Sequence, residues 1–201
     1  MPKWNLQSGK VRNLYSGGNK GAMTCPDGLL LEIPATSSII VDNLFGGCRM
    51  ADVHPMRDGI SVTTTNEALN TALGGSYKFP DELSARVLVR GGNINNVYGG
   101  NDITGRVWGG SAVGIYHSIR GNVYGGGNGN YPYTDNPGLQ GDDIYGDVYY
   151  GAYADGASSV TALNAYRPNA EQVSIRLAGT SASEPTVIAG SVYLGGNCAT
   201  L

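Results

Sequence analysis

The chain has 201 residues, of which 41% are hydrophobic and 14% charged, and its formal net charge is −3. Thirteen Lys and Arg residues against 16 Asp and Glu argue against nucleic acid or an anionic membrane as the main partner, and no apolar run approaches the roughly 18 residues of a membrane span. The 32 glycines lie within apolar and aromatic patterns and not at every third residue, which excludes collagen and a Gly/Ser linker.

A short unit that ends in an aromatic residue with glycine close behind it recurs along the chain. In three copies, such as residues 11–15, two apolar residues lie three positions apart before the aromatic. Four copies, such as residues 119–124, contain one more residue and a glycine. Because β-branched and aromatic residues favour extended backbone and glycine allows a sharp turn, each copy predicts a short strand ending in a corner. The aromatic residues of the seven copies are Tyr15, Phe45, Tyr98, Trp108, Tyr124, Tyr149 and Tyr193.

Three more strands are predicted between these copies, because apolar and polar residues alternate there with a period of two. Between residues 85 and 110 three predicted strands follow one another, separated only by glycine pairs or small polar turns. Strands this close favour an all-β fold, a parallel β-helix or solenoid, over the alternative, a β-sandwich of hairpins. The three additional strands are predicted at 28–33, 85–90 and 172–177.

Three insertions interrupt the predicted coils, at 49–86, 128–143 and 154–171. The first contains Thr64 and Glu67 at capping-box spacing before apolar residues on one helical face, and so predicts a short helix near 65–73. The second is rich in turn residues and is expected to be a loop. We expect residues 1–201 to form a single solenoid domain within a longer repeat protein, because neither end carries the polar cap that a solenoid needs.

The repeated aromatic residues are expected to occupy one position in successive coils. One coil cannot bury its inward side chains, whereas coils stacked about 4.8 Å apart bury a continuous column. We therefore expect the seven aromatic residues to stack, each removing roughly 150–250 Å² from water. Asparagines beside the strands are expected to form hydrogen-bonded ladders. The glycines are interpreted as coil corners, since neither a dinucleotide-binding fingerprint nor a P-loop is present.

One copy opens into a loop whose composition suits a carbohydrate. Its tyrosine rings can stack on sugars while its amides and carboxylate bond sugar hydroxyls, although an ordinary Tyr/Pro turn explains the same residues. These candidate ligand residues are Asn128, Asn130, Tyr131, Tyr133 and Asp135. Carboxylates further along the loop could hold calcium or could be solvated turn residues, and no other cofactor or metal is expected. The calcium candidates are Asp142, Asp143 and Asp147.

Two further sets of residues leave alternatives open. Cys25 and Cys48 form a disulfide if the compartment is oxidising, or remain partly buried thiols. A β-helix polysaccharide lyase or glycoside hydrolase is the alternative function. Asp142 and Asp143 are the carboxylates available to a hydrolase, and Arg120 with the acidic loop could serve a lyase. The motif at 52–58 offers a further group, Asp52, His54 and Asp58. The Gly-His-Gly and Arg-Ile-Lys elements of such hydrolases are absent, so we do not expect an enzyme.

The strings Val-Tyr-Gly-Gly-Gly, Leu-Tyr-Ser-Gly-Gly-Asn and Ile-x-Gly-x-Val-Tyr resemble the Gly-rich repeats of large bacterial surface proteins. These include the passengers of autotransporters and of polymorphic outer-membrane proteins, and repeat proteins of gut anaerobes. The resemblance covers most of the chain except 49–86 and 154–171. It implies a right-handed parallel β-helix that serves as a non-catalytic, extracellular stalk or adhesin segment at the bacterial cell surface. Its implied partners are neighbouring repeats or subunits, together with carbohydrate or host protein.

Overall fold

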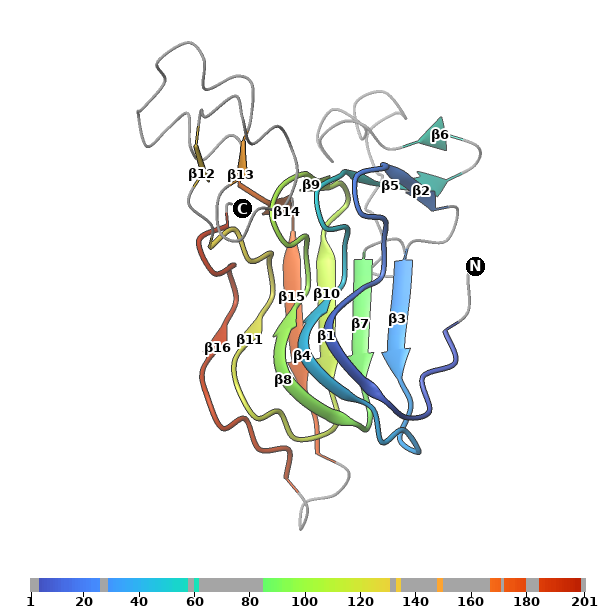
Figure 1. The fold of residues 1–201 in the computed structure, drawn as a ribbon, viewed down its shortest axis with the longest axis vertical. Coiled ribbons are helices and arrows are strands. Elements are labelled where there is room, and N and C mark those ends of the chain that lie inside the picture. The colour runs from blue at the N-terminus through green and yellow to red at the C-terminus, as the bar shows by residue number, and fades with distance from the viewer. Residues whose placement is uncertain are drawn as a thin grey trace, which may run out of the picture.

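The computed structural model of the chain describes residues 4–25, 29–57, 60–61, 85–130, 133–134, 148–149, 167–170, 172–179 and 185–199. Every regular element in these ranges is a β-strand (Figure 1). The helix predicted near residues 65–73 lies outside the described residues. Within the described part of the chain there is no helix that could cross a membrane.

Most strands belong to three sheets. The first sheet contains β1 (Lys10–Tyr15), β4 (Ile40–Phe45), β8 (Asn93–Tyr98), β11 (Val123–Tyr124) and β16 (Val192–Tyr193). The second sheet contains β2 (Met23–Cys25), β5 (Val53–Arg57), β9 (Arg106–Val107) and β14 (Asn169–Ala170). The third sheet contains β3 (Leu29–Ile33), β7 (Ala85–Val89), β10 (Ser111–Ile115) and β15 (Val173–Leu177).

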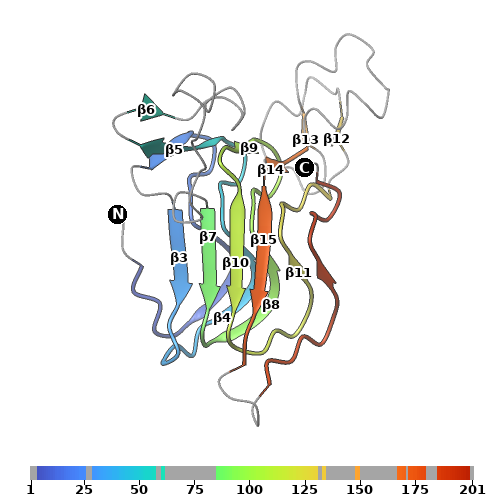
Figure 2. The ribbon, with the colours of Figure 1, turned by 180° about the vertical axis from the view of Figure 1, so that it is seen from behind.

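The chain passes through the first, second and third sheets in that order and then returns to the first. We call one such passage a coil. Coil 1 contains β1, β2 and β3; coil 2 contains β4, β5 and β7; coil 3 contains β8, β9 and β10; and coil 4 contains β11, β14 and β15. β16 begins the next passage. The first sheet lies in front in Figure 1 and the third sheet lies in front in Figure 2.

Neighbouring strands within each of the three sheets run parallel, for example β4 beside β8 and β7 beside β10. Among the described strands one pair is antiparallel, β5 with β6 (Ile60–Ser61). A β-sandwich of hairpins requires antiparallel neighbours, so that predicted alternative is wrong for the part of the chain described. The fold is all-β and solenoid-like, built from parallel sheets.

The predicted insertions are wider than those observed. Residues 49–57 already belong to coil 2, because they lead into β5 and pair with coils 1 and 3. Asn128 and Gly129 continue coil 4 by donating backbone hydrogen bonds to coil 3. β12 (Tyr133–Thr134), within the second insertion, pairs with β13 (Val148–Tyr149), which lies between the second and third insertions. β14, within the third insertion, already belongs to the second sheet.

The two spacings of the repeated unit correspond to two local backbone forms. In a regular strand, residues three positions apart point to opposite faces of the sheet. Val41 and Leu44 lie three positions apart and are both fully buried, so the strand bends between them. Ile119 pairs with Ile94 while Val123 pairs with Val97 in the adjacent coil. Between these two pairs, coil 4 has three residues and coil 3 has two. The additional residue forms a β-bulge, and it makes the apolar residues four positions apart where the shorter copies have three.

The core is built from the inward-pointing residues of the third sheet, where apolar and polar residues alternate, and of the first sheet, where the bends turn additional apolar residues inward. Leu31, Val87 and Val113 lie in register and point inward, where they pack with Val41 and the other inward residues of the first sheet. A second cluster forms where the second sheet meets the start of the third sheet. Each fully buried aliphatic side chain contributes about 1.5–3 kcal/mol before entropy is counted. The core is thus a column that crosses every coil.

Candidate functional site

An aromatic column runs through the first sheet. Tyr15 stacks on Phe45 with 4.9 Å between ring centroids, and Phe45 stacks on Tyr98 at 4.8 Å. Tyr98 stacks on Tyr124 at 4.8 Å, and Tyr124 stacks on Tyr193 at 5.0 Å. The spacing matches that of neighbouring strands because the five residues occupy one register position. The structure therefore brings together five of the seven predicted aromatic residues.

The two inner tyrosines of the column are neutral, and the column is fixed at one end by the buried side chain of Asp102. Asp102 is 1% exposed and accepts a hydrogen bond of 2.7 Å from the hydroxyl of Tyr15. Burial raises the pKa of Tyr98 to about 12, with smaller contributions from Tyr124 and Asp102. Burial also raises the pKa of Tyr124. The phenols of Tyr98 and Tyr124 consequently stay protonated at neutral pH, which suits packing and does not suit general-base catalysis.

The structure places the other two predicted members of the column elsewhere. Trp108 follows β9 in the second sheet, so its inclusion in the stack was wrong. Tyr149 lies in β13, which pairs with β12 and not with the first sheet, and its side chain lies outside the described residues. The motif was misleading because an inward β-branched residue before an aromatic also fits strands of the other sheets.

Asparagines form the predicted ladder beside the aromatic column. Asn43 donates a side-chain hydrogen bond of 3.0 Å to Asn13, and Asn96 donates one of 3.1 Å to Asn43. The Asn96 oxygen then accepts the backbone N–H of Asn122, whose own side-chain oxygen accepts the backbone N–H of Ser191. The ladder thus connects all four coils with the fifth passage.

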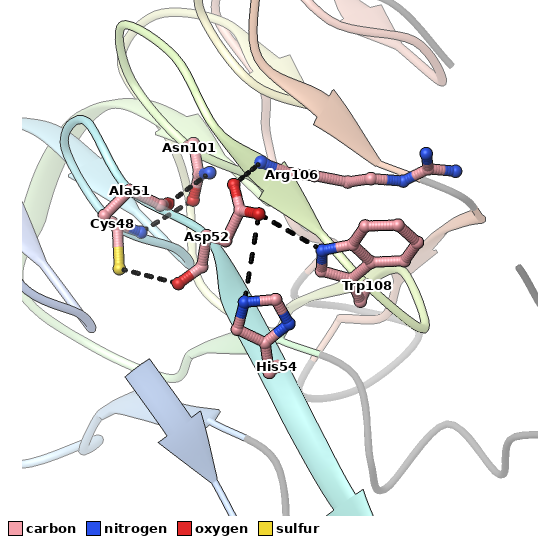
Figure 3. Close-up of polar contacts among 7 residues, drawn as sticks. All are labelled: Cys48, Ala51, Asp52, His54, Asn101, Arg106 and Trp108. Carbon is pink, nitrogen blue, oxygen red and sulfur yellow. Dashed lines mark hydrogen bonds and ion pairs between the residues drawn. The ribbon is translucent and has the colours of Figure 1, made fainter. Parts of the chain in front are cut away.

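A second polar cluster connects coils 2 and 3 on the outer face of the second sheet (Figure 3). Val53 pairs with Val107 and both point inward, so the residues flanking them point outward together. Asp52 accepts hydrogen bonds from the backbone N–H of Arg106 at 2.8 Å and from the indole N–H of Trp108 at 3.3 Å. It also lies 3.8 Å from Nε2 of His54.

The indole of Trp108 lies at the centre of this cluster. The guanidinium of Arg106 lies over the ring, 4.1 Å from its centroid, and the His54 ring is stacked near it at 6.1 Å. A carboxylate beside an imidazole can orient a general base. Here the carboxylate oxygens of Asp52 accept hydrogen bonds from the neighbouring coil, so the arrangement serves to fix one coil against the next. Asp58, the third group of the sequence motif, lies outside the described residues.

Sequence reasoning missed two buried polar residues, Asn101 and Asp102. Asn101 is fully buried; its Oδ1 accepts the backbone N–H of Cys48 at 2.7 Å, and its Nδ2 donates to the carbonyl of Ala51 at 2.9 Å. These bonds satisfy backbone groups at the corner of the previous coil. The available signal was the Asn that follows Gly-Gly in "YGGND", whose amide can replace backbone partners.

The predicted ligand residues are only partly described. Asn128 donates to Asp102 at 2.9 Å and accepts from Asn197 at 3.0 Å, so its amide is used between coils. Asn130 is exposed and receives a long contact of 3.9 Å from the Cys198 thiol. Tyr133 lies in β12, and its side chain is outside the described residues. The remaining candidates lie outside those residues altogether: Tyr131, Asp135, Asp142, Asp143 and Asp147.

The cysteines are unpaired thiols. Cys25 and Cys48 are buried in the cluster beside the second sheet, whereas Cys198 is exposed. Burial raises the pKa of Cys25 and raises that of Cys48 to about 11, a rise that a hydrogen bond with the Gly18 backbone opposes and that Cys25 and Asp52 reinforce. Both buried thiols are therefore protonated at neutral pH and serve as core residues.

No residues in the described ranges form a group of three or more His, Cys, Asp or Glu side chains that could hold a metal ion. Arg120, a candidate for acid–base chemistry, is exposed and donates its backbone N–H to Ile94 of coil 3. Comparison of the chain with protein-family models, curated proteins and solved structures found no match.

Proposed function

We propose that the chain is a closed, right-handed parallel β-helix that serves as a non-catalytic structural and adhesive segment of a bacterial cell-surface or secreted repeat protein. The observation that carries this proposal is the unbroken passage of aromatic and asparagine columns through successive coils. In such a fold each coil is stabilised by its neighbours, and the length of the stack sets the reach of the protein. This suits a stalk.

The edge of β16 supports a stacking role. Val192 and Tyr193 are 41% and 48% exposed, whereas Val123 and Tyr124, their register partners in coil 4, are 0% and 8% exposed. Leu194 beside them is 59% exposed. The edge therefore presents to solvent the same columns that every inner coil buries. We infer that a coil of the same repeat pattern, from a neighbouring repeat or subunit, packs on it.

Replacing Leu194 by Lys is expected to weaken this packing, because it removes an apolar side chain worth about 1.5–3 kcal/mol and adds a charge. Sedimentation velocity over a concentration series should show self-association of the wild type, with a dissociation constant raised by about tenfold or more in the variant. Ile40→Lys is the matched control, since Ile40 is exposed on coil 2 and away from this edge. A wild type that stays monomeric at millimolar concentration contradicts coil stacking between subunits.

The alternative function, a polysaccharide lyase or glycoside hydrolase, makes a different prediction. Incubation with a panel of acidic polysaccharides would then release reducing ends or unsaturated products. A structural and adhesive segment releases none. Product release that persists after purification to homogeneity would overturn the proposed function.

A further inference from the structure

The outer face of the third sheet gathers positive charge, although the whole chain is acidic. Alternation places Val87 and Ile175 inward and leaves Arg86 and Arg176 on the outer face, while Arg90 directly follows β7. Within β3, β7, β10 and β15 the one acidic residue is Glu32. Figure 2 shows these four strands side by side. The three arginines and one glutamate give this face a charge of about +2 at neutral pH.

Two of the arginines approach one tyrosine from different coils. Cζ of Arg90, in coil 2, lies 4.4 Å from the ring centroid of Tyr116, which follows β10 in coil 3. Cζ of Arg176, in coil 4, lies 6.0 Å from the same centroid. The contacts with Tyr116 hold the two guanidinium groups in place before any ligand arrives, which lowers the entropy cost of binding. Arg90 also donates a 2.8 Å hydrogen bond from its Nε to Glu32 in coil 1, an acid that competes with an anionic ligand for this arginine.

The third arginine, Arg86, packs against the face, and its Nε is buried and has no hydrogen-bond partner among the described residues. Arg86 pairs in register with Ala112, and Leu88 pairs with Gly114. The neighbouring strand β10 therefore presents small residues on this face, between the arginine of coil 2 and coil 4. The floor beside Gly114 is closed by Leu88 and by the ring of Tyr116. The face therefore combines a low apolar floor with cationic groups on both sides.

We propose that this face binds an anionic polysaccharide, a chain bearing carboxylates or sulfates that lies across the strands along the direction of coil stacking. Guanidinium groups offer paired N–H donors that match the two oxygens of a carboxylate. Arg90 and Arg176 lie two strands apart, so they are separated by about 10 Å along this direction. That separation suits acidic groups on alternate sugars of an extended chain, and the ring of Tyr116 lies between the two guanidinium groups.

The charge of the molecule separates this ligand from nucleic acid. Duplex DNA carries a negative charge about every 1.7 Å, and strong binding needs many cations along its track. The face has three arginines on a chain of net charge −3. A sparsely charged polysaccharide fits that density better. This inference is independent of coil stacking, because the face lies on the side of the coils and not at the β16 edge.

Affinity electrophoresis and calorimetry with polygalacturonate test the proposal. The double variant Arg86→Gln/Arg176→Gln should bind polygalacturonate about tenfold or more weakly than the wild type. The control Arg12→Gln/Arg120→Gln makes the same change in net charge at two exposed arginines outside the face, and it should bind within about twofold of the wild type. Circular dichroism melting of each variant establishes that it is folded.

Glu32→Gln gives a test of opposite sign. It removes the acid that competes for Arg90, so affinity for polygalacturonate should rise severalfold. Heparin should replace polygalacturonate if sulfates serve as well as carboxylates, and neutral dextran should not bind. Equal losses in the two double variants, binding of dextran as tight as that of polygalacturonate, or tighter binding of duplex DNA would each overturn the proposal.

Discussion

Replacing Phe45 by Ala is expected to lower the free energy of unfolding by about 3–5 kcal/mol. Phe45 is 1% exposed, and its ring is stacked between Tyr15 on one side and Tyr98 on the other. The substitution removes a large buried side chain and leaves a gap within a column whose spacing is set by the backbone, so the neighbouring rings cannot close it. Chemical denaturation followed by tyrosine and tryptophan fluorescence measures the change.

Tyr193→Ala is the matched control for that prediction. Tyr193 occupies the same register position but has one stacking neighbour, Tyr124, and is 48% exposed. Its loss should cost about 0.5–1.5 kcal/mol, the contribution of one aromatic pair. Equal losses at Phe45 and Tyr193 would contradict a continuous column, because they would mean that burial between coils adds nothing.

Gly99→Ala is expected to destabilise the protein by about 1–3 kcal/mol or more, because it forces a side chain between two coils. A Cβ at Gly99 would meet the carbonyl oxygen of Gly125 in the next coil and a methyl group of Val113. Gly46 and Gly125 occupy the same corner in coils 2 and 4, and a Cβ at either would likewise meet the carbonyl of the following coil. Thermal unfolding monitored by circular dichroism measures the loss.

The contrasting substitution is Gly21→Ala. A Cβ at Gly21 would meet no atom within 4 Å, so the protein should keep its stability or gain about 0.4–1 kcal/mol from the lower entropy of the unfolded chain. Opposite signs at Gly99 and Gly21 would show that the corner glycines are required for close approach of the coils. A neutral Gly99→Ala variant would contradict that role.

The sequence was sufficient to predict the strands of the first sheet and three of the four strands of the third sheet, whereas β10 (Ser111–Ile115) was not predicted. The predicted ranges 28–33, 85–90 and 172–177 correspond to β3, β7 and β15, because alternation on a half-buried sheet leaves a clear period of two. The second sheet was predicted less well. Its strand in coil 2, β5, lies in the range predicted as an insertion, 49–86, and its strand in coil 3, β9, lies in a repeat copy, 103–108, that was assigned to the aromatic column. Short strands beside corners carry too few residues to show a period.

Trp108 illustrates why pattern alone did not assign residues to sheets. It follows Tyr98 by 10 residues, whereas Tyr124, the true successor in the column, follows Tyr98 by 26. A coil of three strands and three corners cannot be completed in 10 residues, so the spacing alone excludes Trp108 as the successor of Tyr98 in the column. The contact of Trp108 with Asp52 and His54 could not be predicted, because it depends on the register between coils 2 and 3 across an insertion of unknown path.

The most direct test of parallel, in-register coils is an engineered disulfide between β10 and β15. Ala112 and Ser174 are register partners on the outer face of the third sheet, and neighbouring parallel strands place their Cα atoms about 4.8 Å apart, within the range that a disulfide spans. In a Cys198→Ser background, the pair Ala112→Cys/Ser174→Cys should cross-link almost completely under mild oxidation and shift on a non-reducing gel. The pair Ala112→Cys/Arg176→Cys, separated by a diagonal of about 8 Å, should not. Preferential cross-linking of the second pair, or of neither pair, would contradict the stacked coils.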